Sequence, residues 1–143
     1  MKVLFVCHGN VGRSQVAQVC FGKLSQHEAS CAGTAVDETL ARQNITSRKM
    51  KDALSQRAAE YIRHEFGVDI SERERRQLNP EIIDEADRVI VITEKGDWPD
   101  YLLEGGKVEF WDIGEPLGRD DAFVLEVYAQ VRQRVEQLVK DIG

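Results

Sequence analysis

The chain opens, after Met1, with Lys2-Val3-Leu4-Phe5-Val6-Cys7-His8-Gly9-Asn10-Val11-Gly12-Arg13-Ser14. Residues 2–6 are mostly apolar and β-branched, which is typical of a buried strand. A loop that contains two glycines follows, and helical spacing of apolar residues begins after Ser14. We therefore predict a strand, then a loop that cradles a tetrahedral oxyanion, then a helix.

This loop supports nucleophilic chemistry at Cys7. A thiol at the end of a strand, facing the first N–H groups of the next helix and the positive end of its dipole, favours the thiolate form. Five residues separate Cys7 from Arg13, enough for the backbone to curl into a nest whose amides point inward. Arg13 adds a planar fork that matches two phosphate oxygens, and Ser14 can hydrogen-bond the sulfur. Cys7 is therefore the candidate nucleophile.

The residues inside the loop are expected to shape the anion site. Gly9 and Gly12 allow the curl of the backbone. Asn10 suits a left-handed backbone position, and its side chain can brace the loop. Together with His8, Val11 and Ser14, these residues are the ones that we expect to contact the bound oxyanion.

Residues 3–14 resemble the signature loop of the low-molecular-weight protein tyrosine phosphatases and of the related thioredoxin-coupled arsenate reductases. The resemblance covers most of the chain, since residues 31–34, 76–78 and 86–93 also match family segments. It implies a phosphotyrosine protein phosphatase I-like fold and a phosphocysteine intermediate on Cys7. We expect neither a metal nor another cofactor, because the loop amides and Arg13 supply the positive field.

The resemblance also implies a general acid, which the family carries in an Asp-Pro pair after the last strand. Alignment on Pro116 puts Glu115 at this position. Glutamate carries the same proton on a longer arm. Asp112, Asp120 and Asp121 therefore remain alternatives.

The bulk properties favour one domain over residues 1–143. The chain is 42% hydrophobic and 31% charged, as in soluble globular proteins, and contains no apolar run long enough for a membrane span. The residues before the loop are too few for a signal peptide, so we expect a cytoplasmic protein. We also expect the protein to be a monomer. The net charge of −6 argues against nucleic acid or an anionic membrane as a partner.

Alternating strands and helices predict an α/β domain of three layers with a four-stranded parallel sheet. Strands are expected at residues 2–6, 28–34, 87–93 and 107–113. In a helix over residues 15–27, the buried face should hold Val16, Val19, Cys20 and Leu24. Four further helices are predicted: one that ends at Gly67, one that begins at Asn79-Pro80, a short one within residues 94–103, and a long last helix. The last helix has an apolar stripe of Val124, Val127, Val131, Val135, Leu138 and Ile142.

Two basic segments lie outside the loop. Residues 37–55 form a longer connection than in the family. Its cations are Arg42, Arg48, Lys49 and Lys51. We expect them on a solvated helical face; the alternative is that they recruit acidic phosphoproteins. Residues 71–76 contain Arg73, Arg75 and Arg76, which we expect to be exposed, and Arg76 alone matches a family position.

The two remaining cysteines lack metal-ligand spacing, and reduced thiols are expected. Cys20 is predicted to be core. Cys31 takes the place of a family serine that hydrogen-bonds the loop asparagine, and a thiol is a weaker partner. The alternative is that Cys31 is a redox partner of Cys7. A protective second cysteine, common inside the family's loop, is replaced here by Gly12.

Taken together, the sequence predicts a phosphomonoester hydrolase, in the first place a protein-tyrosine phosphatase. Its substrate is expected to be a phosphorylated protein or a small aryl phosphate. One alternative is an arsenate reductase that uses an external thiol, because residues 72–99 contain no cysteine. The other is a phosphate-binding regulatory module with little turnover.

Overall fold

The computed structural model describes residues 1–94, 96, 98–103, 106–114 and 120–143. The strands are β1 (Lys2–Cys7), β2 (Glu28–Gly33), β3 (Arg88–Val91) and β4 (Val108–Phe110). The helices are α1 (Arg13–Leu24), α2 (Val36–Arg42), α3 (Arg57–Phe66), α4 (Pro80–Glu85), α5 (Asp100–Leu103), α6 (Asp121–Ile142) and the 3₁₀ helix η1 (Met50–Asp52).

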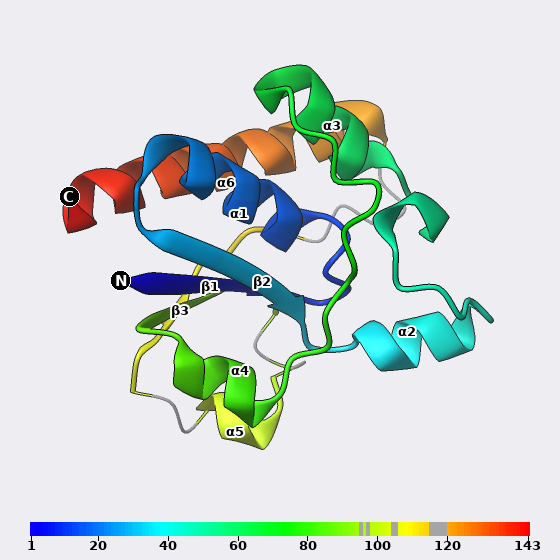
Figure 1. The fold of residues 1–143 in the computed structure, drawn as a ribbon, viewed down its shortest axis with the longest axis horizontal. Helices are drawn as coiled ribbons and strands as arrows, with labels where there is room; N and C mark the ends of the chain where they lie inside the picture. The colour runs from blue at the N-terminus through cyan, green and yellow to red at the C-terminus, as the bar shows by residue number, and fades with distance from the viewer. Residues whose placement is uncertain (95, 97, 104–105, 115–119) are drawn as a thin grey trace.

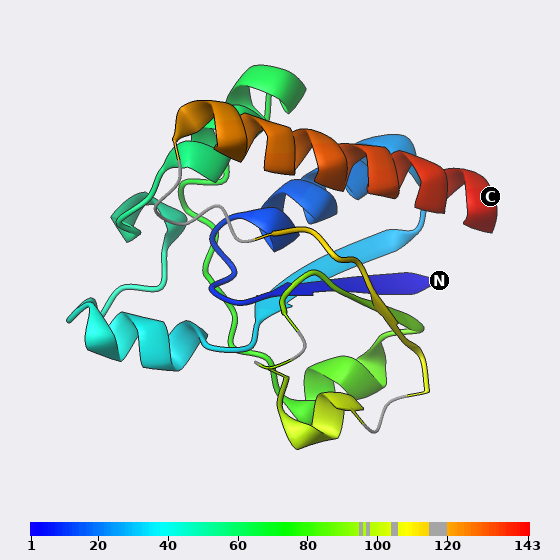
Figure 2. The same ribbon diagram turned by 180° about the vertical axis from the view of Figure 1, so that it is seen from behind.

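The four strands form one parallel sheet in the order β2-β1-β3-β4. Helices α1, α3 and α6 cover one face, and α4 and α5 cover the other (Figures 1 and 2). Helix α2 lies beyond the carboxyl end of β2. The three-layer α/β fold predicted from the sequence is therefore confirmed.

Both faces of the sheet are buried, as expected for parallel strands between helices. In β1, Val3 and Phe5 pack with α1 and α6, whereas Leu4 and Val6 pack with α4 and α5. The alternation follows from the two-residue period of a strand. Trp111 adds the largest buried side chain, with its ring centroid 6.0 Å from that of Phe5.

Most of the predicted helix features are present. Gly67 ends α3 with a φ of 69°, the left-handed position that suits glycine, and the Asn79 side chain caps α4 by accepting from the Ile82 N–H. In α6 five of the six stripe residues are buried, and Ile142 is half-buried. The prediction for Leu24 is wrong: this residue is the last of α1, and its side chain is 49% exposed.

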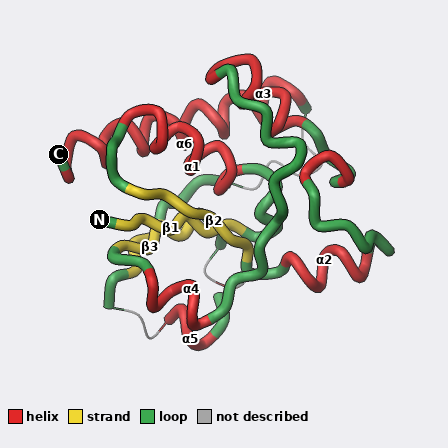
Figure 3. Tube along the Cα trace, viewed as in Figure 1, coloured by secondary structure: helices red, strands yellow, loops and turns green. Residues whose placement is uncertain are grey.

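The prediction of one charged helical face in residues 37–55 is also wrong. Only Arg42 lies on a regular helix, and the rest of the segment is loop apart from η1 (Figure 3). Arg48 pairs with Asp37, while Lys49 and Lys51 both hydrogen-bond Glu72 at 2.8 Å. These lysines, through hydrogen bonds and charge, lower the pKa of Glu72 to about 2. The cations share no single helical face because they lie on separate pieces of backbone: Arg42 on α2, Arg48 and Lys49 in the loop, and Lys51 on η1.

None of the helices in the described ranges has the length and apolar character needed to cross a membrane.

Candidate active site

Cys7 ends β1 and is almost fully buried. Its Sγ lies 2.9 Å from Ser14 Oγ, the contact expected from the sequence. The Asn10 side chain donates from Nδ2 to the same hydroxyl at 2.8 Å. The serine proton is therefore directed toward the sulfur, because the amide occupies an acceptor position on the oxygen.

Asn10 has the left-handed conformation that the sequence predicts, with a φ of 53°. Its Oδ1 accepts a hydrogen bond from the backbone N–H of Arg76 at 2.8 Å. Its backbone carbonyl accepts from Gln15 Nε2 at 3.0 Å. Asn10 therefore braces the loop against a segment that lies 66 residues further along the chain.

Five of the loop carbonyls accept hydrogen bonds from groups elsewhere in the protein. The carbonyls of Cys7 and His8 accept from the backbone N–H groups of Thr34 and Ala35, both at 2.9 Å. The other acceptor and donor pairs are Gly9 with Arg75, Asn10 with Gln15, and Gly12 with Val16. In a trans peptide the N–H points opposite to the carbonyl, so the amides of residues 8–11 and 13 turn away from these partners. This is the amide orientation that the predicted anion nest requires.

Arg13 lies at the carboxyl edge of the sheet and is 2% exposed. Its Nη1 donates to the carbonyls of Ile92 at 2.7 Å and Ile113 at 2.8 Å, which follow β3 and β4. Glu94 Oε1 lies 3.8 Å from the same nitrogen. Two strand ends therefore hold the guanidinium beside the loop.

The segment of residues 71–79, here called the strap, runs beside the loop and is hydrogen-bonded to Gly9 and Asn10. Arg75 on the strap donates from Nε at 3.1 Å and from Nη2 at 3.0 Å to the Gly9 carbonyl. The sequence prediction that Arg75 is exposed is wrong, since only 3% of it is accessible.

Burial alternates along this extended segment. Arg73 and Gln77 are partly buried, whereas Glu74 and Arg76 are exposed. The alternation of acid and base over residues 72–75 is the signal that could have identified Arg75 from the sequence.

Glu115, the residue predicted to be the general acid, lies outside the described residues. Asp112 is exposed. Asp120 caps α6 by accepting from the Phe123 N–H at 2.9 Å. Asp121 lies 3.8 Å from Arg57. The assignment of Glu115, with its three alternatives, stays a prediction.

Cys20 and Cys31 are buried free thiols. Burial raises the pKa of each to about 11. Cys31 donates to Gln18 Oε1 at 2.9 Å, and a hydrogen bond with Asn10 offsets part of the burial effect. Both thiols are protonated at neutral pH, which makes them poor nucleophiles.

Trp98 and Tyr101 are held in place by hydrogen bonds and, for Trp98, by a ring contact. Trp98 Nε1 donates to the Thr93 carbonyl at 3.1 Å, and its ring meets Phe110 edge to face. The Tyr101 hydroxyl donates to the Leu78 carbonyl at 3.0 Å. Each polar atom therefore has a structural partner.

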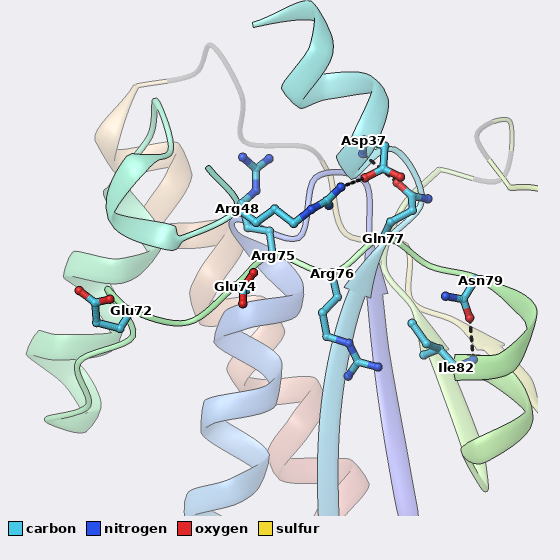
Figure 4. A pocket seen from close by; sticks show the side chains of 9 residues that line it. All are labelled: Asp37, Arg48, Glu72, Glu74, Arg75, Arg76, Gln77, Asn79 and Ile82. Atoms are coloured by element: carbon cyan, nitrogen blue, oxygen red, sulfur yellow. Dashed lines mark hydrogen bonds and ion pairs between the residues drawn. The ribbon is translucent and has the colours of Figure 1, made fainter. Parts of the chain in front are cut away.

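A surface pocket of about 660 Å³ lies on the outer side of the strap (Figure 4). It is lined by Asp37, Arg48, Glu72, Glu74, Arg75, Arg76, Gln77, Asn79 and Ile82. None of the loop residues 7–14 lines this pocket, so it is distinct from the nest.

Solved structures with the same fold include phosphatases and an arsenate reductase. Wzb of Vibrio vulnificus, in complex with benzylphosphonate, is 21% identical, has a TM-score of 0.77, and the match covers 98% of this chain and 97% of that one. The arginine phosphatase YwlE of Bacillus subtilis, with a phosphorylated active-site serine in place of cysteine, is 19% identical, with a TM-score of 0.71 and coverages of 99% and 95%.

The arsenate reductase of Archaeoglobus fulgidus is 25% identical to the chain, with a TM-score of 0.69 and coverages of 96% and 98%. Residues 2–143 match the family described as low molecular weight phosphotyrosine protein phosphatase. This match spans the nest, the strap and every strand of the sheet. The chain therefore belongs to the low molecular weight phosphotyrosine protein phosphatase family.

Proposed function

We propose that the protein hydrolyses phosphomonoesters of phenols, such as phosphotyrosine, through a phosphocysteine intermediate on Cys7. The observation that carries this proposal is the position of Cys7 Sγ, 2.9 Å from Ser14 Oγ in a loop whose carbonyls turn outward. A sulfur nucleophile and a ring of amides then face the same tetrahedral group.

In the first step, the Cys7 thiolate attacks phosphorus and forms an S–P bond. The bond between phosphorus and the leaving oxygen breaks, and Glu115 in its protonated form gives its proton to that oxygen. Loop amides and the Arg13 guanidinium hold the equatorial oxygens, where negative charge accumulates. The products of this step are a phenol and phosphocysteine.

In the second step, water attacks the phosphocysteine. The carboxylate of Glu115 takes a proton from the water, the S–P bond breaks, and inorganic phosphate leaves. The electron pair returns to sulfur, where the hydroxyl of Ser14 donates a hydrogen bond to the departing thiolate. Cys7, Glu115 and the loop are then ready for another cycle.

Two related structures support this mechanism. The YwlE variant carries phosphate on the serine that replaces a cysteine, so that site accepts a phosphoryl group on its nucleophile. Wzb binds benzylphosphonate, a phosphonate with an aromatic ring. A phenol, with a pKa of about 10, is also a better leaving group than an alcohol, which favours aryl phosphates.

The first test is hydrolysis of para-nitrophenyl phosphate in EDTA, across pH, by wild type and by Cys7→Ser and Glu115→Gln variants. We expect no turnover with Cys7→Ser and a kcat about 10²–10⁴-fold lower with Glu115→Gln. Glu126→Gln is the matched control, since Glu126 is exposed on α6, and should retain wild-type activity.

Two other outcomes of these measurements would each favour one of the alternative functions. Phosphate binding without turnover by wild type would contradict the phosphatase proposal and favour a regulatory module. Release of arsenite with an external thiol, faster than phosphate release, would favour arsenate reduction. The raised pKa of Cys20 and Cys31 disfavours a version that relies on internal thiols.

A further inference from the structure

Two charged side chains are buried in the described part of the chain, and both are arginines at the nest, Arg13 and Arg75. Burial of a charge is costly unless a partner compensates it. Glu94 lies 3.8 Å from Arg13. Among the described residues, no carboxylate lies within ion-pair distance of Arg75, whose hydrogen-bond acceptor is the Gly9 carbonyl. This buried positive charge therefore calls for an anion nearby.

Arg75 is directed to the loop by its neighbours on the strap. Its backbone N–H donates to the Arg48 carbonyl at 2.7 Å, and the next residue donates to Asn10. Figure 4 shows the Arg75 and Arg76 side chains pointing in opposite directions, while Arg48 reaches Asp37. Only Arg75 of this group sends its guanidinium to the loop.

The contact with Gly9 acts on a ligand-binding group. The Gly9 carbonyl and the Asn10 N–H belong to one planar peptide and point in opposite directions. Two donors from a charged guanidinium hold the carbonyl toward the strap, so the N–H is held toward the concave side. They also polarise the peptide, which makes the N–H a stronger donor.

Arg75 also interacts with the nucleophile through charge. Burial lowers the pKa of Arg75, and the charge of Cys7 opposes this shift. The guanidinium and a thiolate at Cys7 therefore attract each other. Nearby Arg48 repels Arg75, and Asp37 partly neutralises Arg48.

We propose that Arg75 is a positioning residue of the oxyanion site: it fixes the Gly9–Asn10 peptide so that the Asn10 N–H faces the bound phosphate, and its charge offsets that of the Cys7 thiolate and of the phosphate. This inference rests on the proposed function, because it assigns Arg75 a role in that same site. It predicts that loss of the guanidinium weakens oxyanion binding even when the fold is intact.

The test compares wild type with Arg75→Met, which keeps the bulk without the charge, and Arg75→Lys, which keeps the charge with less hydrogen bonding. Phosphate affinity is measured by calorimetry at constant ionic strength, and KM and kcat are measured with para-nitrophenyl phosphate. We expect Arg75→Met to bind phosphate about 10-fold more weakly and to raise KM about 10-fold. Arg75→Lys should recover part of both losses, and the exposed Arg63→Met control should match wild type.

A second measurement follows the Asn10 amide by NMR. Phosphate should shift this resonance strongly in wild type and much less in Arg75→Met, because the Gly9–Asn10 peptide is no longer held. If Arg75→Met does not fold, Arg75→Lys decides the question by the same titration, with an intermediate loss of affinity supporting the proposal.

Several results would overturn this inference. One is folded Arg75→Met with phosphate affinity within twofold of wild type. Another is a lower kcat at unchanged KM, without recovery in Arg75→Lys, which indicates a structural role alone. A wild type that binds phosphate but hydrolyses no ester ends the proposed function, while the phosphate titration still decides the role of Arg75. No phosphate binding by wild type ends both.

Discussion

At the scale of single residues, surroundings decide the chemistry of the three cysteines. Cys7 lies beside the Ser14 hydroxyl at the end of β1. Cys20 and Cys31 belong to the buried core, and burial raises the pKa of each to about 11. Three identical side chains therefore divide into one candidate nucleophile and two core residues.

The raised pKa of Cys31 predicts a loss of stability in alkali. The ordinary thiol pKa is 9.0 and the folded-state value is about 11, so folding favours the protonated thiol. This contribution is complete below about pH 9 and is lost as pH rises toward 11, in total about 2–3 kcal/mol. Urea unfolding of wild type and Cys31→Ala measures it: the free energies of unfolding should converge as pH rises. Parallel curves would contradict the prediction.

At the scale of elements, β2 ends against the loop of residues 7–14. Gly33 is the register partner of Cys7 and is bonded on its other side to Arg76 and Leu78 of the strap. A Cβ added to Gly33 would lie 2.7 Å from the His8 oxygen and 2.8 Å from the Asn10 nitrogen. The loop, β2 and the strap therefore pack so closely at Gly33 that no room is left for a side chain.

This close approach predicts the effect of Gly33→Ala. The clash is with backbone atoms, which cannot rotate away, so we expect destabilisation of about 1–3 kcal/mol and weaker phosphate binding as the loop shifts. Gly22→Ala is the control: Gly22 lies in α1 with open space around its Cβ position, and alanine should stabilise the helix by about 0.5–1 kcal/mol. Chemical denaturation and phosphate titration of both variants test this. Equal stability of the two variants would contradict it.

Local patterns explain which features the sequence could predict. The strands, the α6 stripe and the left-handed Asn10 depend on the periodicity or conformational preference of nearby residues, and all are present. The burial of Arg75 depends on Gly9, 66 residues away, and charge alone suggests an exposed side chain. Leu24 fits the apolar spacing, but spacing does not show where α1 loses its neighbours. The assignment of Glu115 as the general acid stays a prediction.

At the scale of the molecule, the candidate site unites distant parts of the chain. Arg13 is bonded to Ile92 and Ile113, which are 79 and 100 residues further along. The chain carries a net charge of −6, yet its buried charges in the described ranges are the cations at the nest. Attraction for an oxyanion is therefore local.

Because the ligand site depends on these distant contacts, phosphate should stabilise the whole fold. At about 100 times its Kd, phosphate adds about 2.7 kcal/mol, which raises Tm by about 8 °C in a chain of this size. Calorimetry with phosphate, against chloride at equal ionic strength, measures the shift. Arg13→Met should lose most of it, and an equal shift in this variant would contradict the assignment of Arg13 to the anion site.

The bond between Arg13 and Ile113 also has a consequence for synthesis on the ribosome. Cys7 and its loop are made first and Ile92 follows, but the second carbonyl that anchors the Arg13 guanidinium is missing until Ile113 has been added. At about 5–20 residues per second, the hundred residues between them take about 5–20 s to add. For that time the nascent chain carries its reactive thiol without a finished anion site, so a cell makes almost the entire protein before any of it can act on a phosphate ester.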